Sequence, residues 1–193
     1  MGLPLRKPPA HYTYADYARW PEDQRYELID GVAYAMTGPN RRHQAIVGEV
    51  YRQIANALES HPCRVYLAPF DVRLPKADEA DAQVDTVVQP DLSVFCDRGK
   101  LDDKGARGAP DWVIEVLSPS TAVHDHILKR SVYERAGVRE YWLVHPTDRI
   151  VTVYWLTDGE YGRPEVYELT GRTASRVLPE VAIDWDRVLG DLD

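Results

Sequence analysis

Two carboxylate side chains occupy positions that are otherwise typical of buried strands. Glu115 lies within the apolar segment 111–117, where an unpaired charge would be costly to bury. Asp91 follows Pro90 and opens the apolar run 92–95, 24 residues before Glu115. Adjacent strands lie roughly 4.8 Å apart, so two carboxylates at matching heights can share a hard cation such as Mg²⁺, which binds oxygen ligands. The alternatives are a solvent-facing edge position for Glu115 and an ordinary turn for Asp91.

A lysine follows these carboxylates on the next expected helix. Asp125, Lys129 and Tyr133 are spaced i, i+4 and i+8, so they share one face of a helix over residues 118–136. In the functional interpretation the Lys129 ammonium lies over the cation site, where it orients water or neutralises charge on a phosphate. The alternative is a surface Asp125–Lys129 pair, which contributes only about 0.2–0.5 kcal/mol. The spacing leaves both interpretations open.

His43 and Glu27 are weaker candidates for the same site. His43 stands in the first turn of an expected helix and shares the inward face with Ile46. A helix N-terminus favours anions, so His43 is either a site residue or a histidine at the edge of the core. Glu27 belongs to the short apolar run 26–29, and spacing does not say which face of the strand it takes.

Three arginines flank the expected site in the sequence. Arg41 and Arg42 open the same helix as His43, and Arg130 follows Lys129. They are candidates for holding the phosphates of a nucleic acid. Each of them, taken alone, is more typical of a solvated surface.

The elements that must position these residues follow from apolar periodicity and end signals. A helix over 41–59 has Asn40 as N-cap and apolar residues at a 3.6-residue period. The helix after Glu115 is expected to begin at Ser118-Pro119 and to stop at Gly137. The other expected elements are a short helix over 12–20 capped at Thr13, a hairpin over 25–36 around Asp30-Gly31, strands over 64–74, 86–96 (interrupted at Pro90), 140–144, 150–156 and near 165–169, loops over 76–86 and 97–109, and a C-terminal tail docked by Ile183 and Trp185.

This order of elements predicts one α/β domain over residues 12–193, after a loose Pro-rich segment over 1–11. The domain is expected to have a mixed β-sheet core flanked by helices, with added β-hairpins. A chain of 193 residues, 44% hydrophobic and 28% charged, is long enough for one sizeable core.

Composition also bounds the function. A net charge of −8 disfavours a broad, non-specific nucleic-acid binder but allows a local basic groove. There is no apolar run that could span a membrane, no signal core and no nucleotide-binding glycine motif, so we expect a cytoplasmic protein without a nucleotide cofactor. Cys63 and Cys96 each lie in an apolar stretch and are expected to be buried and unpaired.

The motifs together resemble a known family. Pro90-Asp91 followed by Glu115-Val116-Leu117 is similar to the Pro-Asp … (Asp/Glu)-X-Lys signature of the restriction-endonuclease-like superfamily, with Leu117 in the place of the signature lysine. In several branches of that superfamily the lysine has moved to the following helix, and Lys129 matches such a move. Within the superfamily the chain resembles the bacterial Uma-two endonucleases over roughly residues 12–170, in motifs that also include Tyr26–Gly31, His43, Ser118–Thr121, Asp125, Tyr133, Ala136-Gly137 and Glu140–Trp142.

The resemblance implies a mixed-sheet core, a homodimer, DNA as the substrate, and Mg²⁺ as the cofactor with Mn²⁺ as a possible substitute. It carries Asp91, Glu115 and the carbonyl of Val116 over as metal ligands and Lys129 as the catalytic lysine. Glu27 and His43 become accessory residues of the site.

These observations favour a metal-dependent endonuclease that hydrolyses DNA phosphodiester bonds. Two alternatives remain open. Leu117 and the charge of −8 favour a decayed nuclease fold that binds nucleic acid or protein without cleaving it. A hydrolase using Asp91 and Glu115 as an acid/base pair on a sugar would work without any metal.

Overall fold

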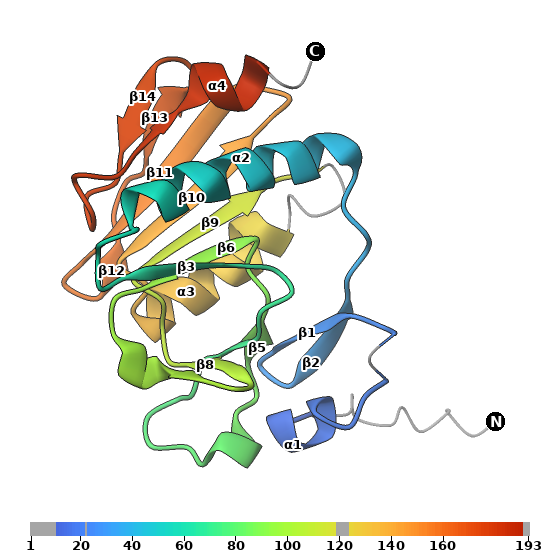
Figure 1. Cartoon of the computed structure of the whole chain (residues 1–193). Helices are drawn as coiled ribbons and strands as arrows, with labels where there is room; N and C mark the ends of the chain where they lie inside the picture. The colour runs from blue at the N-terminus through green and yellow to red at the C-terminus, as the bar shows by residue number, and fades with distance from the viewer. Residues whose placement is uncertain (1–10, 22, 119–123, 191–193) are drawn as a thin grey trace.

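The computed structural model describes residues 11–21, 23–118 and 124–190. Within these residues, the largest element is a seven-stranded mixed sheet that forms the centre of the molecule (Figure 1). Its strand order is β12-β11-β10-β9-β6-β3, with β13 also paired to β11. The strands are β3 (Arg64–Leu67), β6 (Leu92–Phe95), β9 (Trp112–Val116), β10 (Glu140–His145), β11 (Ile150–Thr157), β12 (Glu160–Tyr161) and β13 (Glu165–Glu168).

A second, smaller sheet lies beside the central one. Its strand order is β2-β1-β5-β4-β8-β7, and the short helix α1 (Tyr14–Tyr17) packs near its first strands (Figure 1). The strands are β1 (Tyr26–Ile29), β2 (Val32–Ala35), β4 (Val72–Arg73), β5 (Val87–Val88), β7 (Leu101–Asp102) and β8 (Gly105–Arg107), with 3₁₀ turns at η1 (Asp81–Gln83) and η2 (Arg98–Lys100). A two-stranded ribbon of β14 (Arg172–Ala174) and β15 (Ala182–Asp184) completes the strands.

Helices cover both faces of the central sheet. Helix α2 (Arg41–Ala57) and helix α4 (Trp185–Gly190) lie over one face (Figure 1). On the other face are the π-helical turn η3 (His124–Lys129) and helix α3 (Arg130–Ala136), which ends at Gly137 in the left-handed conformation with φ +89°. Such a sheet buries apolar side chains on both sides, as its near-continuous apolar strands predict.

Strand β9 shows why one carboxylate is held inside the sheet. Trp112 and Ile114 belong to the core beneath α2, whereas Val113 and Leu117 belong to the core beneath α3. Because successive side chains alternate between faces, Glu115 lies on the α3 face. Lys129 stands at the junction of η3 and α3, on the same side of the sheet.

Most of the expected elements are confirmed. The short helix, the hairpin around Asp30-Gly31, the helix capped by Asn40, the strands over 111–117, 140–144, 150–156 and 165–169, and the helix end at Gly137 all appear with small shifts of their ends. The C-terminal tail is docked by Ile183 and Trp185, both fully buried. Ser118 is described and is not helical, as expected of an N-cap, whereas Pro119 and the 1–10 part of the expected loose segment lie outside the described residues.

The strand expected over 64–74 is wrong as a continuous element, and this segment and the segment 86–96 each divide between the two sheets. The strand expected over 64–74 is β3 in the central sheet, a cis Ala68–Pro69 bond, and β4 in the second sheet. The interruption expected at Pro90 in the strand over 86–96 is confirmed, and it separates β5 in the second sheet from β6 in the central sheet. The segment 97–109, expected as a loop, contains the β7–β8 hairpin, and the loop expected over 76–86 ends in buried residues at 84–86. The chain therefore passes between the central and the second sheet at two places, and Asp91 lies at one of them, just before β6.

The prediction that the two cysteines are unpaired is wrong, because Cys63 and Cys96 form a disulfide. Strands β3 and β6 are antiparallel, with Arg64 opposite Phe95, so the next positions outward, Cys63 and Cys96, also face each other. The expected apolar surroundings are confirmed, since Cys63 is buried in the core beneath α2 and Cys96 packs against it.

No helix among the described residues is long and apolar enough to cross a membrane.

Candidate active site

Asp91 and Glu115 lie side by side at the ends of two neighbouring inner strands of the central sheet, β6 and β9. Strands β6 and β9 are antiparallel with Leu92 opposite Ile114, which brings the neighbouring positions Asp91 and Glu115 together. The backbone N–H of Asp91 donates to Oε2 of Glu115 at 3.2 Å, and the N–H of Val116 donates to Oδ2 of Asp91 at 2.8 Å. The sequence expectation of two carboxylates at matching heights on adjacent strands is confirmed.

Lys129 reaches these carboxylates from the helical segment on the same face of the sheet. Its Nζ atom lies 2.9 Å from Oε1 of Glu115 and 2.9 Å from Oε1 of Glu27. The hydroxyl of Tyr133 donates to the same Glu115 oxygen at 2.9 Å. Lys129 and Tyr133 therefore share a face as expected, whereas the side chain of Asp125 lies outside the described residues. Leu117, which stands in the place of the signature lysine, is part of the core beneath α3.

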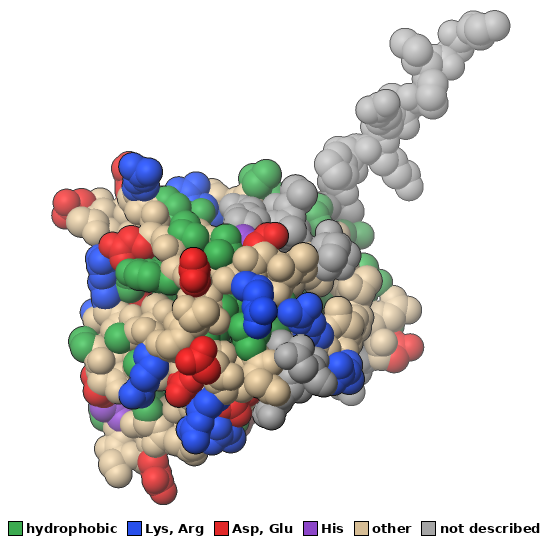
Figure 2. Space-filling model, turned by 90° about the horizontal axis from the view of Figure 1, so that it is seen from above, with side chains coloured by type: hydrophobic (Ala, Val, Ile, Leu, Met, Phe, Trp, Pro, Cys, Tyr) green, Lys and Arg blue, Asp and Glu red, His purple; other side chains and the backbone are tan. Residues whose placement is uncertain are grey.

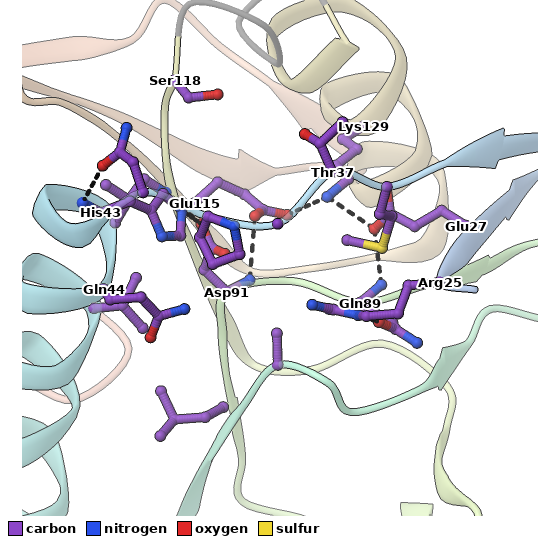
Figure 3. Close-up of a pocket in the computed structure, with 18 of the residues that line it drawn as sticks. Arg25, Glu27, Thr37, His43, Gln44, Gln89, Asp91, Glu115, Ser118 and Lys129 are labelled. Carbon is purple, nitrogen blue, oxygen red and sulfur yellow. Dashed lines mark hydrogen bonds and ion pairs between the residues drawn. The ribbon is translucent and has the colours of Figure 1, made fainter. Parts of the chain in front are cut away.

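Glu27 joins the site from the second sheet. It lies on β1, its side chain is buried, and its Oε1 atom accepts the backbone N–H of Gln89 at 2.8 Å in addition to Lys129. Lys129 thus lies between one carboxylate of each sheet, as Figure 3 shows. Spacing in the sequence left the face of Glu27 open, and the pairing of β1 with β2 and β5 decides it.

His43 approaches Asp91 from the first turn of α2. The Asn40 side chain accepts the backbone N–H of His43 at 2.9 Å, which caps the helix and fixes the place of the ring. Nε2 of His43 lies 3.0 Å from Oδ2 of Asp91 (Figure 3). Nδ1 of the same ring is buried and has no hydrogen-bond partner among the described residues. The inward orientation expected for His43 is confirmed.

A cavity of about 550 Å³ is lined by the side chains of Glu27, His43, Asp91, Glu115 and Lys129. Glu115 and Lys129 lie at its base, each with a side chain only 4% exposed, and Asp91 is 19% exposed. The walls come from the loop between β2 and α2, from the first two turns of α2, and from the end of β3; they include Met36 to Asn40, Gln44, Val47, Gly48, Leu67 and Ala68.

The three arginines expected near phosphates do not line this cavity. Arg42 donates to the carbonyl of Pro146 at 3.1 Å, and the guanidinium of Arg130 lies over the Tyr154 ring at 5.1 Å. Arg41 is exposed at the start of α2. Their contact with a nucleic acid therefore remains a prediction that the cavity itself does not support.

Arg25 is a cationic residue of the cavity that the sequence reasoning missed. Its Nε and Nη2 atoms both donate to Oε1 of Gln89, at 3.0 and 2.7 Å (Figure 3). The Gln89 amide in turn donates to the Tyr17 hydroxyl and to Asp71, at 3.0 and 2.8 Å. Burial, together with the Asp71 carboxylate, raises the pKa of Tyr17 well above its ordinary value, so this hydroxyl stays protonated. No motif marked Arg25 or Gln89, because their places depend on strand pairing far away in the sequence.

The donor set of the site is compatible with Mg²⁺. Mg²⁺ commonly uses one or two carboxylates and keeps several water ligands, and Asp91 and Glu115 supply adjacent carboxylate oxygens. No group of three His, Cys, Asp or Glu side chains in the described part of the chain is arranged around a common point for a metal. A cation at these strand ends would therefore rest on the two carboxylates, and would compete with Lys129 and Tyr133 for Glu115.

A mixed sheet covered by helices on both faces, with opposed carboxylates at the ends of two inner strands and a lysine beside them, defines a restriction-endonuclease-like α/β protein. The fold matches the crystal structure of a protein from Anabaena variabilis ATCC 29413, described as "a putative nuclease belonging to DUF820", with a TM-score of 0.71 over 94% of this chain and 99% of that chain, at 23% identity.

The family model Uma2, described as "Putative restriction endonuclease", matches residues 14–186, and the chain belongs to this family. The chain is also 28% identical, over 146 residues, to an "Uncharacterized protein" of Synechocystis sp. (strain PCC 6803), a match that covers 74% of this chain and 73% of that protein. The family resemblance drawn from the sequence motifs is confirmed.

Proposed function

We propose that this protein is a metal-dependent endonuclease that hydrolyses phosphodiester bonds in DNA. The observation that carries the proposal is the meeting of Asp91, Glu115 and Lys129 within hydrogen-bonding distance at the base of one cavity. These residues come from β6, β9 and the η3–α3 segment, so only the folded chain assembles them. Membership in the Uma2 family supports the same activity.

Asp91 and Glu115, with the carbonyl of Val116 that the resemblance adds, would hold Mg²⁺ or Mn²⁺. When bound there, the cation polarises the phosphate and lowers the pKa of a coordinated water. Asp91 is held in place for this role by the N–H of Val116 and by His43, at 2.8 and 3.0 Å.

Lys129 supplies the positive charge of the site. Its ammonium, held by Glu115 and Glu27, would stabilise negative charge that develops on the phosphate. Glu27 anchors the ammonium from the second sheet, at 2.9 Å. Because Lys129 is almost fully buried, its interaction with a phosphate is weakly screened by solvent.

The test is cleavage of supercoiled plasmid DNA and of single-stranded DNA with Mg²⁺ or Mn²⁺. Asp91→Ala and Lys129→Ala are expected to lose cleavage, while Asp148→Asn, an exposed carboxylate removed from the cavity, is expected to keep it. Circular dichroism and the unfolding temperature establish that each variant is folded. Full activity in Asp91→Ala, or cleavage that survives chelation of the metal, would contradict the proposal and, in the second case, favour the acid/base hydrolase.

A second candidate function is a binding module without cleavage. It is favoured by the internal pairing of the site, because both Glu115 oxygens already accept hydrogen bonds: Oε1 from Lys129 and Tyr133, and Oε2 from the backbone N–H of Asp91. In this case neither Mg²⁺ nor Mn²⁺ should raise the unfolding temperature, whereas a metal-binding nuclease is stabilised by either ion. Light scattering tests the accompanying proposal of a homodimer, which has twice the chain mass of 22.0 kDa.

A further inference from the structure

The cavity continues from the carboxylates along the surface of helix α2. Gln44, Val47 and Gly48 line it on the helix side, and Leu67 and Ala68 line the opposite side. Gln44 extends from α2 into the space beside Asp91 (Figure 3). The carboxylates and Lys129 thus form a charged end of the cavity, and the aliphatic side chains form a more apolar end.

Gly48 is an exposed residue of α2 that lines this second end of the cavity. It lies in the middle of the 17-residue helix α2, where glycine costs about 1 kcal/mol relative to alanine. A Cβ atom at position 48 would meet nothing within 4 Å. Side chains at i and i+4 lie on one face of a helix and lean toward its N-terminus, so a side chain at position 48 would extend toward Gln44 and into the cavity. Packing against the rest of the protein does not require glycine here.

The size of the cavity fits one nucleotide and is too small to enclose a double helix. A volume of about 550 Å³ falls within the roughly 300–1,000 Å³ of pockets that enclose a single small ligand. Glu115 and Lys129 are only 4% exposed, so a phosphate must enter the cavity to reach them. In a paired duplex, the complementary strand and the stacked neighbours prevent one nucleotide from entering such a pocket unless it leaves the stack.

The charge of the chain disfavours broad contact along a nucleic-acid backbone, so binding has to depend on the cavity itself. Proteins that bind long stretches of duplex or of single strand follow the phosphates with many lysines and arginines, whereas this chain has a net charge of −8. On the face drawn in Figure 2, the described Lys and Arg side chains are interspersed with Asp and Glu and form no continuous band. The described cations that line the cavity are Arg25 and Lys129.

We infer that the cavity accepts one nucleotide of an unpaired DNA strand, with its phosphate at Asp91, Glu115 and Lys129 and its base beside Val47, Gly48 and Leu67. The amide of Gln44 can donate to or accept from a base edge. This inference rests on the proposed function and deepens it, because it names single-stranded or locally melted DNA as the substrate class.

The first experiment compares binding of one fluorescein-labelled oligonucleotide, single-stranded or annealed to its complement, by fluorescence anisotropy. Ca²⁺ replaces Mg²⁺, since it binds the same oxygen ligands. The dissociation constant of the single strand is expected to be at least about tenfold lower than that of the duplex, a difference of about 1.4 kcal/mol. Equal or tighter binding of the duplex, or no binding of either, would overturn the inference, as would a preference for the same strand made of RNA.

The second experiment fills the cavity at position 48. Gly48→Phe places a ring beside Gln44. Asn56→Phe is the matched control, because Asn56 is exposed on the same helix and does not line the cavity. Phenylalanine has a higher helix propensity than glycine and about the same as asparagine, so neither variant should unfold at a lower temperature than the native chain. Gly48→Phe is expected to weaken single-strand binding at least tenfold and Asn56→Phe to leave it within about twofold. Unchanged binding in Gly48→Phe would overturn the inference.

Failure of the inference can be told apart from failure of the proposed function. If Mg²⁺ or Mn²⁺ supports cleavage of intact linear duplex as fast as that of a single strand, the nuclease stands and the inference fails. If the single strand binds preferentially and Gly48→Phe blocks it, but no metal supports cleavage, the inference stands and the hydrolytic function fails.

Discussion

The ammonium of Lys129 lies 2.9 Å from Glu115, and the two residues are brought together by different kinds of element. Glu115 lies on the inner strand β9, with its side chain on the face of the sheet that α3 covers. Lys129 comes from the helical segment η3–α3 that packs on this face. Glu27 lies equally close to the ammonium on its other side. One buried cation therefore links two buried carboxylates, and removing it affects both the stability of the fold and the chemistry of the site.

The Lys129→Met variant is expected to be destabilised because it leaves Glu27 and Glu115 buried without their cation. Breaking a buried ion pair in this way costs about 3–5 kcal/mol. Adding Glu27→Gln removes one of the two stranded charges and should recover part of the unfolding free energy. Urea denaturation measures both values. Cleavage should stay lost in the double variant, and restored cleavage would show that Lys129 acts only through the fold.

Asp91→Asn is expected to separate metal binding from folding. The asparagine side-chain oxygen can still accept the N–H of Val116, which now donates to Asp91 at 2.8 Å, so the fold should be retained. The loss of charge should abolish the rise in unfolding temperature produced by Mn²⁺ and lower cleavage at least about 100-fold, about 2.7 kcal/mol. Differential scanning fluorimetry with and without Mn²⁺ measures the first effect, with Asp148→Asn as control. A Mn²⁺ response equal to that of the native chain would exclude Asp91 as a ligand.

Glu140 predicts a dependence of stability on pH that does not involve the active site. Its carboxylate is fully buried and accepts hydrogen bonds from Trp142, Ser175, Arg176 and Val177. Burial raises the pKa of Glu140 above its ordinary value, although these hydrogen bonds act in the opposite direction. The folded state then binds the proton more tightly than the unfolded state, so the unfolding free energy should fall as pH rises from the unfolded pKa, about 4.3, through the raised folded pKa.

The matching variant is Glu140→Gln, which cannot titrate. The glutamine amide has one oxygen acceptor and an NH₂ donor, whereas four hydrogen-bond donors surround this position. Because some of these buried donors would lose their acceptor, the variant should have a lower unfolding free energy at neutral pH, by about 1–3 kcal/mol. Across the same acidic range its unfolding free energy should decline less with pH than that of the native chain. Urea denaturation at a series of pH values measures both effects, and identical slopes for the two proteins would contradict the assignment.

The disulfide between Cys63 and Cys96 closes a loop with a sequence separation of 33 residues. In the chain-entropy model a loop of this length contributes roughly 3–4 kcal/mol to the unfolding free energy. Reduction, or replacement of both cysteines by serine, should lower the stability by about that amount while the sheet remains. Alkylation of the unfolded chain without reductant should label neither cysteine. Labelling of both would show that the native protein does not contain the bond.

Much of the site could be predicted from residue types and spacing alone. The costly position of Glu115 within an apolar strand and the Pro90-Asp91 step marked the two carboxylates, and their opposition on adjacent strands is confirmed. Helical spacing placed Lys129 and Tyr133 on one face, and both contact Glu115. The shared face of Lys129 and Tyr133 depends only on the 3.6-residue repeat of a helix. The opposition of Asp91 and Glu115 also needs β6 to pair with β9, two strands that follow each other closely enough in the sequence to be expected as neighbours.

The remaining parts of the site depend on contacts between residues far apart in the sequence. Arg25 and Gln89 meet across a separation of 64 residues, and no local pattern encodes that meeting. The face taken by Glu27 was open until β1 had partners on both sides, because a shift of one residue in pairing would reverse it.

The sequence by itself determined the class of fold, the family and the residue types at the centre of the site. Apolar periodicity, helix-end signals and the order of motifs can each be identified from residues that are close together in the sequence. Only the tertiary structure decided that 64–74 and 86–96 each divide between two sheets, that Cys63 meets Cys96, and that Arg42 and Arg130 turn away from the cavity. The physical reason is that strand pairing satisfies backbone hydrogen bonds with whichever distant segment the whole fold brings near.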